Sequence, residues 1–159
     1  MKTAIIYYSL EGNMDYIAKR IANDKTADLY KLIPKKAYPT GKVSKYVWGG
    51  KSATFSERPE LTNEKIDLVK YDTLIIGSPV WAGTTAPPLN SFFADYSISG
   101  KNIILIATCG GGSTEKLFAK MRSHLNENEI KGTFTFIEPL HSQDASINEK
   151  INQIRDLIS

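Results

Sequence analysis

The chain has 159 residues, of which 42% are apolar and 23% charged. This length and composition are typical of one globular core, so we expect residues 1–159 to form a single domain. They exclude a disordered chain, and the apolar runs are too short to cross a bilayer, so no membrane association is expected.

The net charge of +3 is unevenly distributed. Residues 31–58 contain seven Lys or Arg and one acidic residue, Glu57, so that the rest of the chain is mildly acidic. A nucleic-acid-binding module would need aromatic residues among the cations on a recognised fold, so no nucleic-acid partner is expected. The segment could instead recruit an acidic protein or an anionic small molecule, or simply be solvated.

Cysteine and histidine are scarce. Cys109 is the only cysteine, and the sequence has no Asn-x-Ser/Thr acceptor and no secretory leader. We therefore expect a cytoplasmic protein. The two histidines, His124 and His141, belong to no cluster with ligand spacing, so no metal site is expected.

Strand and helix patterns alternate along the chain. Apolar, β-branched runs predict strands over residues 2–8, 26–33, 73–77, 102–108 and 131–138. Helical spacing predicts helices from about Met14, from Thr62 or Asn63 through Leu68, from Pro87, from Thr114, and around Ile147–Ile158. A long basic loop, residues 34–59, follows the second strand. Five strands and five helices in alternation predict a three-layer α/β/α fold with a parallel sheet, whose ligands lie beyond the carboxyl ends of the strands.

The loop after the first strand, residues 9–14, leads into a helix N-terminus. Backbone N–H groups and the helix dipole make such a loop suitable for a phosphate without any Lys or Arg. The alternative is a simple strand-to-helix turn capped by Asn13.

The loop after the third strand, residues 77–83, places Trp81 at the carboxyl edge of the sheet. An indole there could stack on a planar ring. Alternatively, Trp81 packs under the helix that begins at Pro87.

The loop after the fourth strand, residues 108–113, contains three consecutive glycines. They suggest positive φ angles or a close backbone approach, with N–H groups that could meet the carbonyls of a heterocycle. The alternative is a flexible connection to the helix beginning at Thr114.

Together these loops, which read Ser-Leu-Glu-Gly-Asn-Met, Gly-Ser-Pro-Val-Trp-Ala-Gly and Thr-Cys-Gly-Gly-Gly, resemble the three FMN-binding loops of the flavodoxin family. The resemblance implies a five-stranded parallel sheet of order 2-1-3-4-5 and one noncovalent FMN. It also implies that residues 9–14 hold the phosphate, that Trp81 stacks on the isoalloxazine, and that the third loop borders the pyrimidine end. The implied cofactor-binding residues are Ser9, Leu10, Glu11, Gly12, Asn13, Met14, Pro79, Val80, Trp81, Ala82, Gly83, Thr108, Cys109, Gly110, Gly111 and Gly112.

Two positions of the first loop depart from the family pattern, which has hydroxyl residues where Glu11 and Met14 stand. Glu11 adds a negative charge near the phosphate, and Met14 fits the apolar stripe of the helix better than a ligand contact. The third loop also lacks a tyrosine, so one flavin face would be open.

The resemblance implies electron transfer through FMN, with the chemistry supplied by the flavin and no catalytic side chain. It further implies that Gly83 lets a peptide at the flavin N5 reorient on reduction. An NAD(P)H- or quinone-reacting FMN oxidoreductase is one alternative, in which the open face admits a substrate. A flavodoxin-like binding module that lacks FMN is another. The expected partner is a redox protein, acidic if the basic loop recruits it, or a small-molecule electron donor or acceptor.

Overall fold

The computed structural model describes residues 1–23, 26–40, 57–142 and 144–159. In chain order the elements are β1 (Thr3–Tyr7), α1 (Asn13–Ile21), β2 (Asp28–Lys31), the 3₁₀ helix η2 (Leu68–Lys70), β3 (Thr73–Trp81), β4 (Thr84–Thr85), α3 (Pro87–Asp95), β5 (Asn102–Cys109), α4 (Glu115–Ser123), β6 (Glu129–Ile137) and α5 (Ala145–Ile158).

The sheet has the order β2-β1-β3-β5-β6, and these five strands are all parallel. The two-residue strand β4 lies outside this path and pairs antiparallel with the end of β3. The predicted order 2-1-3-4-5 is therefore confirmed, because β5 and β6 are the fourth and fifth parallel strands. The fold is the flavodoxin-like α/β/α arrangement.

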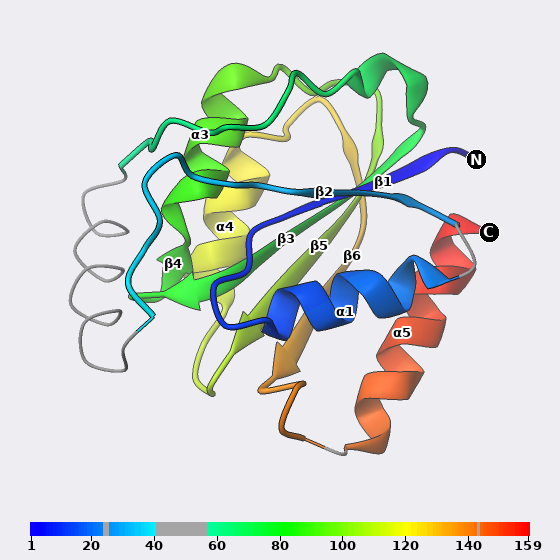
Figure 1. Cartoon of the computed structure of the whole chain (residues 1–159). Helices are drawn as coiled ribbons and strands as arrows, with labels where there is room; N and C mark the ends of the chain where they lie inside the picture. The colour runs from blue at the N-terminus through cyan, green and yellow to red at the C-terminus, as the bar shows by residue number, and fades with distance from the viewer. Residues whose placement is uncertain (24–25, 41–56, 143) are drawn as a thin grey trace.

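Helices cover both faces of the sheet: α1 and α5 lie on one side, α3 and α4 on the other (Figure 1). Successive strand residues point to opposite faces, so each central strand supplies both cores. The α1/α5 core contains Ile5, Ile75 and Ile104, and the α3/α4 core contains Ile6, Ile76 and Leu105. All six side chains are fully buried. This double burial explains why the strands read as nearly continuous apolar runs.

The helix predicted from Thr62 or Asn63 through Leu68 is wrong. Residues 62–67 form no helix, and the side chain of Asn63 bonds to the backbone at and just after the end of β2: its Oδ1 accepts from Ile33 N at 2.8 Å and its Nδ2 donates to Lys31 O at 2.8 Å. These long-range bonds compete successfully with a weak local helix signal. Only the 3₁₀ turn η2 follows, where Asp67 Oδ1 accepts from Val69 N.

Strand lengths also differ from the prediction. β2 is shorter than the predicted 26–33, and β3 is longer than the predicted 73–77, ending at Trp81. Much of the predicted second loop is thus strand, followed by a tight turn into β4.

The described residues contain four α-helices and the 3₁₀ helix η2, whereas the sequence predicted five helices. Of the basic loop it describes residues 34–40 and 57–59, so Trp48, Lys42, Lys45 and Lys51 lie outside the described residues. No helix within the described parts of the chain has the length and apolarity needed to span a membrane.

Candidate functional site

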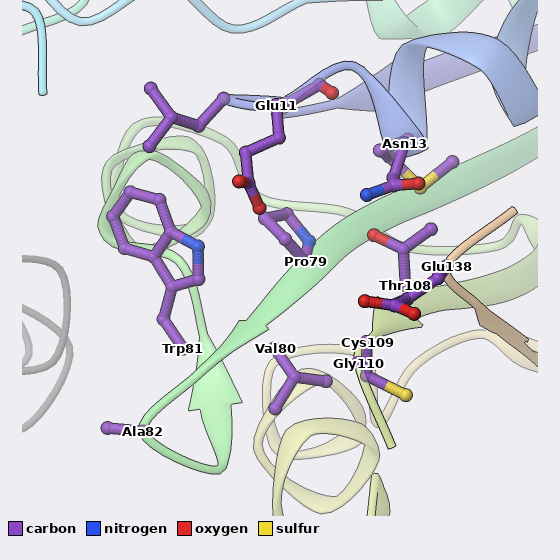
Figure 2. A pocket seen from close by; sticks show the side chains of 13 residues that line it. Glu11, Asn13, Pro79, Val80, Trp81, Ala82, Thr108, Cys109, Gly110 and Glu138 are labelled. Carbon is purple, nitrogen blue, oxygen red and sulfur yellow. The ribbon is translucent and has the colours of Figure 1, made fainter. Parts of the chain in front are cut away.

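A cavity of about 280 Å³ opens at the carboxyl ends of β1, β3 and β5, beside the start of α1 (Figure 2). Its lining consists of Ser9, Leu10, Glu11, Asn13, Met14, Pro79, Val80, Trp81, Ala82, Thr108, Cys109, Gly110 and Glu138. The three predicted loops therefore meet around one pocket, as parallel strands require.

Twelve of the sixteen predicted residues line this pocket; the exceptions are Gly12, Gly83, Gly111 and Gly112. These four glycines all have positive φ angles, between 77° and 130°. They shape the three loops without contributing to the wall. That the lining residues bind a cofactor stays a prediction.

The first loop is organised by Ser9, which is 6% exposed. Its Oγ accepts hydrogen bonds from Gly12 N and Asp15 N, both at 3.2 Å, and so caps the start of α1. Gly12 is the residue that precedes the helix, with φ of 94°. The side chain that caps the helix is thus that of Ser9. The alternative interpretation of this loop had Asn13 as the cap, but Asn13 is the first residue of α1.

Asn13 ties the first loop to the segment that follows β6. Its Oδ1 accepts from Leu140 N at 3.1 Å, and a Cβ on Gly12 would lie 3.2 Å from Leu140 Cδ1. The amide group of Asn13 faces the pocket with its nitrogen (Figure 2).

Met14 reaches the pocket but belongs mainly to the α1/α5 core, where it is 1% exposed. This agrees with its interpretation as a packing residue. It contributes no hydroxyl donor to the loop.

Trp81 forms one end of the pocket, and its indole nitrogen points inward (Figure 2). Tyr8 and Tyr38 pack edge-to-face against the indole, with ring centroids 5.6 and 5.1 Å away. Burial and the neighbouring Tyr38 raise the pKa of the Tyr8 phenol well above its usual range, so this hydroxyl stays uncharged. The rings of Tyr8 and Tyr38 therefore fix the orientation of the Trp81 indole at the edge of the cavity.

The turn after Trp81 is a two-residue hairpin connection. Val80 pairs with Thr85 and Trp81 with Thr84, leaving Ala82 and Gly83 at the tip with φ of 48° and 77°. Two consecutive positive φ angles are characteristic of the tight turns that match strand twist. Ala82 lacks the freedom of glycine and is therefore strained.

The part of the pocket wall formed by the end of β5 contains a polar group without a hydrogen-bond partner in the protein. Thr108 is 2% exposed, and its Oγ1 is buried without a hydrogen-bond partner. Figure 2 shows this oxygen directed toward the pocket. A buried hydroxyl without a partner costs free energy unless a ligand or water satisfies it.

Glu138 is the lining residue that the sequence reasoning missed. It directly follows β6 and has φ of 39°; its N–H donates to Cys109 O at 2.9 Å, and its carbonyl accepts from His141 N and Ser142 N. A Cβ on Gly110 would lie 3.8 Å from its Oε1. The rule that ligands meet the carboxyl ends of parallel strands could have identified it, because β6 ends at this same edge.

The pocket wall is acidic. Glu11 and Glu138 are its two ionisable carboxylates, and no Lys, Arg or His lines it among the residues that the structure describes. Within those same ranges no group of three or more His, Cys, Asp or Glu is arranged to hold a metal ion.

Comparisons with known proteins agree with this fold. A protein from Bacteroides eggerthii proposed to be a flavoprotein superposes with a TM-score of 0.78 at 21% identity, covering 99% of this chain and 97% of that one. A flavoprotein from Lactobacillus acidophilus in complex with FMN gives 0.73 at 20% identity, over 95% and 98% of the two chains. An NADPH-quinone reductase from P. pentosaceus gives 0.65 at 12% identity, over 100% and 98%.

At these identities the structures establish the fold alone. The comparison with curated proteins gave no match. The model of one family, described as flavodoxin, matches residues 2–134. The chain therefore belongs to the flavodoxin family.

Proposed function

We propose that this chain binds one FMN noncovalently in the pocket and transfers electrons through it. The observation that carries the proposal is the convergence of the start of α1, the Trp81 indole and the buried Thr108 hydroxyl on a single cavity. These groups match the anionic, planar and hydrogen-bonding parts of a flavin mononucleotide. The FMN complex of the L. acidophilus structure supports the choice of flavin.

The residues present fit such a group. Thr108 Oγ1 lacks a partner within the protein, which a ligand carbonyl or hydroxyl would supply. Trp81 offers an aromatic wall already braced by Tyr8 and Tyr38, so little ordering is required on binding.

FMN when bound would supply the redox chemistry itself. The chain's own residues would orient and shelter it: Trp81 would exclude water from one face of the flavin ring. Thr108 would hold the ring or the ribityl chain in place through a hydrogen bond. No lining side chain needs to act as an acid or base. The Ala82–Gly83 turn adjoins the pocket wall, and its peptides could adjust to the protonation state of a neighbouring ring nitrogen.

A second candidate is an FMN-dependent oxidoreductase that accepts electrons from NAD(P)H or passes them to a quinone. It is favoured by the third loop, where Cys109 and Gly110 line the pocket without an aromatic cover. The neighbour named NADPH-quinone reductase supports this alternative. In either case an electron donor or acceptor must reach the exposed ring edge.

The basic segment is our proposed recruiting surface for an acidic redox protein. Of its cations in the described region, Lys35 pairs with Glu60 at 3.1 Å and Lys31 lies 3.8 Å from Asp15. Lys42, Lys45 and Lys51 should add most of the positive potential. Replacing these three by Glu should slow reduction by a protein partner at low salt and leave FMN binding unchanged.

The primary test is flavin binding by the purified protein. A yellow preparation that releases FMN on heating, or an apoprotein that quenches added FMN fluorescence, supports the proposal. Trp81→Ala should weaken FMN binding about tenfold, while the matched Trp48→Ala should change it little. A colourless protein that fails to quench FMN would instead identify a binding module without flavin.

Steady-state assays then separate the carrier from the oxidoreductase. An oxidoreductase should oxidise NADPH with a quinone or dye as acceptor and no protein partner. A carrier should show negligible NADPH oxidation alone, and rapid turnover only when a flavodoxin reductase is added.

A further inference from the structure

We propose that Asn90, a residue of α3 that lies outside the pocket, is a positioning residue for the bound flavin: its amide fixes the orientation of the Trp81 indole. The inference rests on the proposed function, because it concerns how one wall of that same pocket is held. It follows from a closed path of contacts that runs from the hairpin bearing the indole to α3, and from α3 to the ring that packs against the indole.

The amide of Asn90 joins two segments that are far apart in the sequence. Asn90 is 6% exposed and belongs to the first half of α3. Its Oδ1 accepts a hydrogen bond from Thr85 Oγ1 at 3.3 Å, and its Nδ2 donates to Glu57 O at 2.8 Å. Buried polar groups are strongly destabilising without partners, so this amide holds Thr85 and the backbone of Glu57 at a fixed separation.

Thr85 connects the amide to the indole through the hairpin. In β4, Thr85 pairs with Val80 and Thr84 pairs with Trp81. Thr85 is buried, so its hydroxyl faces the protein interior. A two-residue strand has few backbone hydrogen bonds of its own, and isolated hairpins are only marginally stable. The hydrogen bond to Asn90 therefore anchors the hairpin, and with it the backbone of Trp81, on α3.

Glu57 connects the amide to the indole along a second route. It begins the segment 57–62, which backbone hydrogen bonds join to residues 33–38; we call these two segments the neck of the basic loop. Within the neck, Lys35 N donates to Glu60 O at 2.7 Å, and the side chains of the same two residues form a salt bridge. The neck is therefore a paired unit, and a hydrogen bond to one of its segments also restrains the other.

The neck brings Tyr38 against the indole. The Tyr38 ring meets the Trp81 ring edge-to-face, with centroids 5.1 Å apart and planes at 84°. Ser91, next to Asn90 in α3, gives the neck a second anchor, because its Oγ donates to Pro59 O at 2.6 Å. The amide of Asn90 differs from this hydroxyl in bonding to both the neck and the hairpin. It therefore sets where the Tyr38 ring lies relative to the backbone that carries the indole.

This arrangement matters for a flavin because an aromatic wall contributes most when its orientation is already fixed. Contact between planar rings depends on their offset and angle, which a loose indole would have to recover on binding. Loss of the Asn90 amide leaves the indole in the pocket wall but frees its hairpin from the neck. We therefore expect FMN binding to weaken about two- to fivefold, less than the roughly tenfold expected when the indole itself is removed.

The first experiment measures the dissociation constant of FMN for variants of this link, by quenching of flavin fluorescence with the apoproteins. Asn90→Leu and Thr85→Val each remove one side of the hydrogen bond and should weaken FMN binding about two- to fivefold. Thr85→Ser keeps the hydroxyl and should bind FMN within about twofold of the wild type. Should Asn90→Leu fail to fold, Thr85→Val tests the same hydrogen bond through a smaller change.

Asn128→Leu is the matched control. The amide of Asn128 also bonds to two backbone groups, since its Oδ1 accepts from Lys101 N at 3.0 Å and its Nδ2 donates to Ile98 O at 2.7 Å. These groups lie near the amino ends of β5 and β6, at the opposite edge of the sheet from the pocket. The substitution should lower the free energy of unfolding and leave the FMN constant within about twofold of the wild type. A purely structural role of Asn90 predicts this same result for Asn90→Leu.

Two further readouts separate positioning from a general loss of stability. In a Trp81→Ala background, Thr85→Val should change FMN binding less than about 1.5-fold, because the side chain through which it acts is absent. In the apoprotein, the indole N–H resonance of Trp81, assigned by its loss in Trp81→Ala, should shift in Thr85→Val and Asn90→Leu. The same resonance should stay unchanged in Asn128→Leu.

Weakened FMN binding that depends on Trp81, together with a shifted indole resonance, supports the positioning role of Asn90. Unchanged FMN binding in folded Asn90→Leu and Thr85→Val overturns this role and leaves the proposed function standing, and so does an equal effect of Thr85→Val with and without the indole. If the wild type binds no FMN, the proposed function has failed. The indole resonance then decides alone, because an unchanged signal in both variants overturns the positioning role as well.

Discussion

A Cβ on Gly77 would lie 2.7 Å from Met14 Sδ and 2.8 Å from Met14 Cε. Met14 belongs to the first turn of α1 and Gly77 to the middle of β3, and the methionine is almost fully buried. The close packing of α1 on the sheet, and with it the position of the first loop, therefore depends on this pair.

A double-mutant cycle tests the pair. Gly77→Ala should lower the free energy of unfolding by about 1–3 kcal/mol through overpacking, and Met14→Ala by about 2–4 kcal/mol through a cavity. The double variant should lose at least about 0.5 kcal/mol less than the sum, because the shorter side chain makes room for the new methyl group. Urea unfolding measures all four proteins. Met121→Ala, in the core on the opposite face, is the control and should add to Gly77→Ala without coupling.

Tyr38 should support flavin binding without lining the pocket. Its ring meets that of Trp81 edge-to-face at 5.1 Å and 84°, so its loss frees the indole to move. Tyr38→Leu should weaken FMN binding about three- to tenfold, and Tyr38→Phe should not. Fluorescence titration measures the effect, with Tyr16→Leu as the control because that ring lies on α1 against Arg20. Equal weakening by the control would refute a specific role for Tyr38.

Substitutions at the two residues of the hairpin tip, Ala82 and Gly83, should change the free energy of unfolding in opposite directions. Ala82→Asn should raise the free energy of unfolding by about 0.5–1 kcal/mol, since asparagine tolerates the left-handed conformation better than alanine. Gly83→Ala should lower it by about 1–2 kcal/mol for the same reason. Ala119→Asn, at an exposed position of α4, should be mildly destabilising and shows that asparagine has no general benefit. Thermal or urea unfolding of the apoprotein decides; a destabilised Ala82→Asn protein would contradict the assignment of strain.

Asp15 should make stability depend on acid pH. Burial alone would raise the pKa of this carboxyl, but hydrogen bonds from Lys19 and Tyr7 and the charges of Lys31 and Lys19 together hold the pKa below its ordinary value of 3.8. The folded state therefore binds this proton less readily than the unfolded state. The stabilisation is fully present above the ordinary pKa and is lost as the pH falls through the folded value.

The variant Asp15→Asn should remove that contribution, so its stability should match the wild type more closely at low pH than at pH 7. Urea unfolding between pH 2.5 and pH 7 tests this. Asp67→Asn is the comparison, an exposed helix-capping carboxylate with a different partner. If the wild type and Asp15→Asn differ by the same amount at every pH, the lowered pKa is refuted.

Local patterns were sufficient for most of the architecture. The buried apolar runs of β3 and β5, the stripe beginning at Met14 and the Pro87–Pro88 helix start each depend on neighbours within a few residues. Alternation of such elements leaves few ways to cover a parallel sheet, which is why the loops could be predicted to meet at one edge. The weak helix before Leu68 failed because the side chain of Asn63 bonds to backbone groups some thirty residues away.

The sequence by itself determined the parallel sheet, the three loops at its carboxyl edge and the packing of Met14 in the core. Only the tertiary structure decided that Tyr38 braces Trp81, that Leu140 meets Asn13, and that Glu138 closes the pocket with a second carboxylate. Periodicity and turn signals report on contacts between residues close in the chain. Contacts across long separations exist only once the packed core has fixed how each strand end faces the next.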